Sequence, residues 1–101
     1  MKFSDTKSDK KWELPQHYPS LKPYERAQVR NQYVKEQDGL CHYCAEPLSG
    51  SPSTNYTLDM RRFPRNFLRY PIHLHHCHQT GLTLGAVHAL CNGILWEVHG
   101  E

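Results

Sequence analysis

Long apolar runs are missing from this sequence, and no stretch approaches the roughly 18 consecutive apolar residues of a membrane-spanning helix. The first segment, Met1 to Lys11, is polar and rich in lysine, and no apolar stretch follows it. We therefore expect neither a secretory signal nor a membrane partner. The sequence favours a cytoplasmic protein whose cysteines are reduced.

A strong net charge is also missing, because 12 basic residues are nearly balanced by 10 acidic ones. The distribution is uneven, however, since residues 60–96 contain no Asp or Glu. The same stretch carries four arginines, Arg61, Arg62, Arg65 and Arg69. Because basic side chains supply much of the affinity of proteins for nucleic-acid phosphates, we predict that these arginines contact DNA. A solvated surface stretch has the same composition, and charge alone does not separate the two interpretations.

Hydrophobic residues are few, at 38% of 101 residues, which indicates one small domain with a limited core. A domain with so small a core is stabilised by a cross-link in addition to apolar packing. The four cysteines can provide it, either as two disulfides or as ligands of a metal ion. Reduced thiols and the spacing described below favour the metal.

The hydrophobic pattern predicts an α+β fold. Residues 1–20 show no periodicity, and we expect them to form a partly flexible arm ahead of a domain at residues 21–101.

Within this domain, a helix is predicted to begin near Pro23 and to end near Gly39, where a CxxC turn and a long loop follow. Alternation of apolar and polar residues predicts a strand at 72–76, and a turn and a second strand at 82–87 come next. Helical spacing of apolar residues then predicts a helix over 89–98.

The cysteines and one histidine have the spacing of a tetrahedral zinc site, with CxxC in the loop and HxxC at the start of the last helix. The complete predicted set is Cys41, Cys44, His88 and Cys91. Cys77 and His78 lie nearby in the sequence and compete with His88 for the fourth position. A redox pair is the other reading of CxxC, but no thioredoxin-like strand and helix surround it.

Histidines are concentrated in the predicted hairpin, where five fall within sixteen positions: His73, His75, His76, His78 and His88. Asn92 follows the predicted zinc ligand Cys91 directly. If the two strands and the last helix fold together, Asn92 faces the end of the first strand and can share a metal ion with a histidine. A simple helix-capping role for Asn92 is equally compatible with its position.

These residues carry a resemblance to the HNH (His-Me finger) endonucleases, and specifically to the branch of phage recombination endonuclease VII. It covers roughly residues 24–98 and rests on three motifs in the order and spacing of that family. They are Gly39-Leu40-Cys41-x-x-Cys44, His75-His76-Cys77-His78-x-Thr80-Gly81 and Leu90-Cys91-Asn92. The resemblance implies a small zinc-stabilised ββα-metal domain with a preceding N-terminal helix.

The resemblance also implies residue roles. His75 and Asn92 would hold a catalytic divalent cation, His76 would be the general base, and His78 would be an accessory active-site residue. A neutral imidazole can take a proton from a water molecule that attacks a phosphodiester. The expected cation is Mg²⁺, or Mn²⁺ or Ni²⁺, because His75 stands where relatives usually have an aspartate and imidazole is the softer ligand.

The function that follows is a metal-dependent DNA endonuclease that nicks DNA or cuts both strands. We expect it to be phage-encoded, to act in the host cytoplasm, and to be a monomer or weak dimer. One alternative is a catalytically inactive HNH-like zinc-binding phage protein that binds and modulates a host protein. Another is a zinc-finger-like DNA-binding module, which leaves the histidine pair and Asn92 unexplained.

Overall fold

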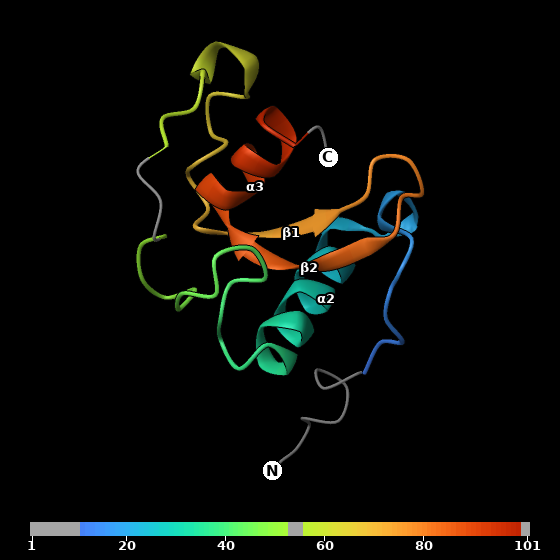
Figure 1. Ribbon diagram of the computed structural model, residues 1–101. Helices are drawn as coiled ribbons and strands as arrows, with labels where there is room; N and C mark the ends of the chain where they lie inside the picture. Colours follow the sequence, from blue (N-terminus) through green and yellow to red (C-terminus); the bar gives the residue numbers. More distant parts are fainter. Residues whose placement is uncertain (1–10, 53–55, 100–101) are drawn as a thin grey trace.

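A computed structural model describes residues 11–52 and 56–99 and shows a small α+β fold (Figure 1). In chain order the elements are η1 (Tyr18–Ser20), α2 (Pro23–Glu36), η2 (Met60–Arg62), β1 (Ile72–His76), β2 (Thr83–His88) and α3 (Ala89–Glu97). The predicted order of helix, loop, hairpin and helix is therefore confirmed. Residues 1–10, half of the predicted arm, lie outside the described residues.

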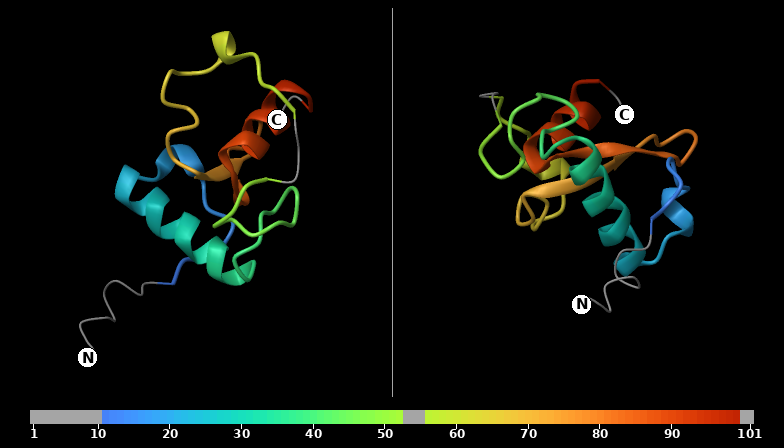
Figure 2. Two further views of the ribbon diagram at one scale, coloured as in Figure 1. Left: turned by 90° about the vertical axis from the view of Figure 1, so that its left-hand side faces the viewer. Right: turned by 90° about the horizontal axis from the view of Figure 1, so that it is seen from below.

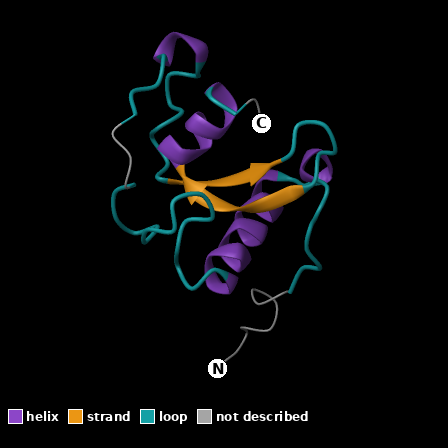
Figure 3. Ribbon diagram, viewed as in Figure 1, coloured by secondary structure: helices purple, strands orange, loops and turns teal. Residues whose placement is uncertain are grey.

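The two strands form an antiparallel hairpin that lies between the two helices (Figure 3). Ile72 pairs with His88 at one end, and the register shifts between His75 and His76 at the other. Both helices contact both strands, and two further views show α2 and α3 on opposite sides of the hairpin (Figure 2). Side chains that point to either face of β1 therefore meet a helix.

Local sequence signals explain where α2 begins and ends. Pro23 occupies the first turn, and the Glu25 carboxylate accepts a hydrogen bond from the backbone N–H of Lys22 at 2.8 Å. The chain leaves the helix through Asp38 and Gly39, which have φ angles of 56° and 75°. Glycine adopts this left-handed backbone without a steric penalty. The helix consequently ends in the turn that leads to the CxxC motif.

The outer edge of β2 is covered, whereas no strand among the described residues pairs with the outer edge of β1. The Gln37 side chain bonds the backbone of Ala86 through both its carbonyl oxygen, at 2.8 Å, and its amide nitrogen, at 2.9 Å. Gln16 accepts a hydrogen bond from the backbone N–H of Thr83 at 2.8 Å. The hairpin therefore has one edge covered by hydrogen-bonded groups and one edge without a paired strand among the described residues.

The last part of the predicted arm is attached to the hairpin turn. The backbone N–H of Tyr18 donates to the Gly81 carbonyl at 2.7 Å, and His17 forms a bridge with Leu82. Trp12 and Gln32 of α2 also exchange hydrogen bonds, at 2.7 and 2.8 Å. These contacts bring Tyr18 next to the end of β1.

The core lies between the CxxC loop, β2 and α3. Its central cluster of buried residues is Cys41, Leu48, Ala86, Val87, Cys91 and Leu95. Two cysteines of the predicted zinc set thus belong to the core itself. Among the described residues, no helix is long and apolar enough to cross a membrane.

Candidate functional site

The four predicted zinc ligands come together in space. The ligand atoms of Cys41, Cys44, His88 and Cys91 all lie within 4.8 Å of one another. The first two side chains come from the turn after α2, His88 ends β2, and Cys91 lies in the first turn of α3. One cluster therefore joins the loop, the hairpin and the last helix.

The CxxC turn has a backbone that suits a metal-bound thiolate. The N–H groups of Tyr43 and Cys44 point at the sulfur of Cys41, at 3.4 and 3.5 Å. Ala45 has a φ of 65°, and its N–H donates to the Cys41 carbonyl at 2.9 Å. Such amide contacts disperse the negative charge of a thiolate.

His88 is oriented as a ligand by its second nitrogen. Its Nε2 lies 2.9 Å from the carbonyl oxygen of Pro47, so this nitrogen donates the hydrogen bond. The other nitrogen, Nδ1, then has its lone pair free and lies 3.4 Å from the sulfur of Cys44. Carbonyl partners of this kind fix the tautomer of metal-binding histidines. Cys77 and His78, the competing candidates, do not belong to the cluster.

The neighbouring thiols of the cluster oppose one another's ionisation, and a bound cation would remove this opposition. Burial, followed by the neighbouring Cys41, raises the pKa of the Cys91 thiol well above its usual value. All four cysteines of the chain are free of disulfides. Three thiolates and one imidazole are a donor set that zinc prefers, and a dication would offset the charge that opposes ionisation. The cluster could therefore bind zinc.

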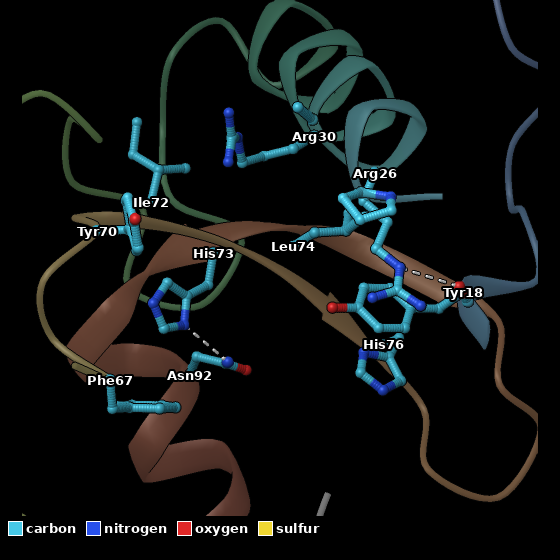
Figure 4. A pocket seen from close by; sticks show the side chains of 12 residues that line it. Tyr18, Arg26, Arg30, Phe67, Tyr70, Ile72, His73, Leu74, His76 and Asn92 are labelled. Carbon is cyan, nitrogen blue, oxygen red and sulfur yellow. Dashed lines mark hydrogen bonds between the residues drawn. The ribbon is translucent and has the colours of Figure 1, made fainter. Parts of the chain in front are cut away.

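A separate pocket of about 360 Å³ opens beside β1, between α2 and α3 (Figure 4). This volume is within the usual range of roughly 300 to 1,000 Å³ for small-molecule sites. Its polar lining residues are Tyr18, Arg26, Arg30, Tyr70, His73, His76 and Asn92. No carboxylate lines it, so its charged groups are all potentially positive.

On one side of the pocket, Asn92 and His73 are hydrogen bonded. The Asn92 amide nitrogen donates to His73 Nδ1 at 3.1 Å, and the ring of Phe67 packs edge-on against the imidazole (Figure 4). Burial lowers the pKa of His73, and the charge of Arg30 acts in the same direction. His73 is consequently neutral near pH 7.

At the other end of the pocket, His76 stacks on Tyr18. The ring centroids are 3.9 Å apart and the planes differ by 7°. Burial lowers the pKa of His76, and the nearby His78, whose ring lies 4.9 Å away, lowers it further. His76 is therefore also an uncharged imidazole near pH 7, which is the form that accepts a proton.

His75 lies elsewhere. Its side chain is only 4% exposed and lines a second cavity with His42 and Tyr43 of the CxxC turn. The histidine that contacts Asn92 is His73, for which the sequence analysis predicts no specific role. Alternation on a strand puts residues 73 and 75 on the same face, but it does not say which of them lies opposite Asn92.

The four arginines predicted to contact DNA are all exposed and belong to the segment around η2. Arg61 forms an ion pair with Asp59, with Nε and Oδ1 at 3.0 Å, so a neighbouring carboxylate compensates its charge. Arg62 lies over the ring of Trp96 at 4.8 Å. None of the four lines the pocket beside β1.

Comparison with known proteins finds no matching family model, no matching curated protein and no matching solved structure. The functional argument therefore depends on the two sites themselves.

Proposed function

We propose that this protein is a metal-dependent DNA endonuclease of the HNH type, with its active site in the pocket beside β1. The observation that carries the proposal is that His76 and Asn92 line one pocket with two arginines. These two residues belong to separate motifs, sixteen positions apart, of the family that the sequence resembles.

In this proposal His76 is the general base. Its neutral ring takes a proton from a water molecule, and the water oxygen attacks the phosphorus in line while the bond to the 3′ oxygen breaks. Tyr18 holds the imidazole by stacking, since its ring is parallel to that of His76. His78 is adjacent to His76 and is its accessory partner.

The residues suited to a catalytic cation in this pocket are Asn92 and a histidine. The resemblance assigns that histidine as His75, whereas the hydrogen bond to Asn92 favours His73. Imidazole and amide donors without a carboxylate fit Mn²⁺ or Ni²⁺ better than Mg²⁺. A bound cation would stabilise the charge that develops on the phosphate and on the leaving oxygen.

The second metal of the proposal is a structural zinc held by the four-residue cluster. Its role is to fix the hairpin against α3, because His88 and Cys91 sit at the junction of β2 and α3. The pocket residues His73 and Asn92 are carried by these same elements.

A second candidate is the inactive HNH-like protein that binds a host protein. Two observations favour it: no carboxylate lines the pocket, and the Asn92 amide is already bonded to His73. Loss of a site within a retained fold is common enough to make this a definite rival.

The test is cleavage of supercoiled plasmid by the zinc-loaded protein in Mg²⁺, Mn²⁺ or Ni²⁺. His76→Ala should lower the rate by about 10² to 10⁴, the usual contribution of a general base. His99→Ala is the matched control, because His99 is exposed and does not line this pocket. Plasmid left intact by the unmodified protein with all three metals would reject the nuclease and favour the host-binding candidate.

A further inference from the structure

Two arginines of α2 point at the pocket from the side opposite His73 and Asn92 (Figure 4). Arg26 and Arg30 are one helical turn apart, a spacing at which like charges destabilise a helix. No ion pair joins either one to a carboxylate among the residues that the structure describes. Both charges therefore add to the positive character of the pocket that these arginines line.

The nearest acidic residues along α2 are engaged elsewhere. Glu25 accepts the hydrogen bond from the backbone of Lys22, and Glu36 accepts one from the Gln32 side chain at 2.9 Å. Neither lines the pocket. The pocket thus keeps its positive potential.

Arg26 is held in place by the arm. Its Nε donates to the Tyr18 carbonyl at 3.3 Å, and its guanidinium lies 4.2 Å from the centre of the Tyr18 ring. Arg30 has neither of these contacts and is the freer of the two to meet a ligand. A guanidinium can bind two oxygens of a tetrahedral phosphate group, so Arg30 can bind such an anion while Arg26 adds a fixed positive charge to the same pocket.

We propose that Arg26 and Arg30 bind a backbone phosphate of DNA in this pocket, opposite His73 and Asn92. The inference deepens the proposed function, on which it rests for the choice of DNA. A phosphodiester matches the pocket because guanidinium groups bind phosphate oxygens in pairs, while the exposed Tyr70 ring offers an apolar surface to the adjoining nucleoside. The site is distinct from the exposed arginines near η2, none of which lines it.

The experiment measures the affinity for a fluorescent duplex oligonucleotide between about 50 and 200 mM salt, without divalent cations, so that binding is separated from cleavage. Arg30→Gln should weaken binding and reduce the slope of log K against log salt by about 1. Lys35→Gln is the matched control, because Lys35 is an exposed cation of the same helix outside the pocket. It should leave the slope unchanged.

Arg30→Lys keeps the positive charge of the side chain and removes only the planar guanidinium group. A change in the folding of this variant therefore cannot come from a lost charge. The variant should retain the salt slope and still lose affinity. Equal slopes for the unmodified protein and Arg30→Gln, or an equal loss in Lys35→Gln, would overturn the inference.

A competition arm distinguishes DNA from a free anion. Inorganic phosphate should displace the oligonucleotide no better than chloride at equal ionic strength. If low phosphate concentrations displace it, and only when Arg30 is present, the pocket holds a small anion and the DNA assignment is wrong.

The two proposals fail differently. Binding that depends on Arg30 together with an intact plasmid under every metal supports the phosphate site and rejects the nuclease. Cleavage that requires His76, together with binding that does not depend on Arg30, supports the nuclease and rejects the phosphate site.

Discussion

His88 is oriented toward the thiols before any metal is considered. The carbonyl of Pro47 accepts its Nε2 proton at 2.9 Å, and Nδ1 lies 3.6 Å from the sulfur of Cys91. The tautomer that this bond selects is the one that ligates through Nδ1. A cluster organised in this way loses little freedom when an ion enters, which favours tight binding.

We expect Cys44→Ala to lose zinc and Cys77→Ala to keep it. Cys44 belongs to the cluster whose ligand atoms lie within 4.8 Å of one another, and Cys77 lies outside this cluster. Zinc content per chain, measured after dialysis against a weak chelator, should be close to one for the unmodified protein and for Cys77→Ala. Retention of zinc by Cys44→Ala would show that another residue completes the site.

The two sites differ in how far single residues could be predicted. The four residues of the candidate zinc site follow from sequence spacing, since CxxC and HxxC each place two donors on one turn of chain. The histidine opposite Asn92 does not, because the packing of α3 along β1 decides whether residue 73 or 75 meets it. The sequence allows Arg26 and Arg30 to contact DNA, but a mixed charged helix face usually contacts only solvent, and the sequence does not place the two arginines at a pocket.

At the scale of secondary-structure elements, the hairpin turn depends on the arm that covers it. Gly81 has a φ of 78°, and its carbonyl accepts the Tyr18 N–H. A Cβ at this position would lie 2.8 Å from the ring of His17 and 3.3 Å from Pro19. Only glycine therefore allows both the left-handed turn and the close approach of the arm.

Gly81→Ala should lower the free energy of unfolding by about 1 to 2 kcal/mol, the cost of a left-handed alanine, with added strain against the arm. Gly50→Ala is the control, because a Cβ there meets only the Pro47 carbonyl at an ordinary 3.7 Å. Urea unfolding of both variants gives the comparison. A midpoint for Gly81→Ala equal to that of Gly50→Ala would mean that residue 81 is not held in this left-handed conformation against the arm.

The elements themselves were largely predictable, and the attachment of the arm was not. Strand β1 has the predicted bounds, β2 is displaced by one residue, and α2 begins at the predicted proline. The spacing of apolar residues, together with proline and glycine at the ends, specifies such elements locally. The arm binds the hairpin mainly through backbone groups and the Thr83 hydroxyl, which leave no hydrophobic pattern in residues 11–20.

At the scale of the whole molecule, the cluster of three cysteines and His88 joins the CxxC turn, the hairpin and α3 inside the core that they share. Only a small set of apolar residues is buried in the described part of the chain, and two of these are the candidate zinc ligands Cys41 and Cys91. Small domains bury a low fraction of their surface, and their total stability is about 5 to 15 kcal/mol. Without a bound cation, three thiols and an imidazole would lie together at that core.

Chelation of zinc should therefore unfold the protein, because the apparent binding free energy of such sites, about 10 to 16 kcal/mol, is comparable with the whole stability of a small domain. The measurement is far-ultraviolet circular dichroism and thermal melting before and after a strong chelator at pH 7. Adding back excess Zn²⁺ should restore the helical signal, whereas Mg²⁺ should not, because it avoids thiolate ligands. If zinc-free protein melts cooperatively at the original temperature, packing alone holds α3 against the hairpin, and the cluster is dispensable for the fold.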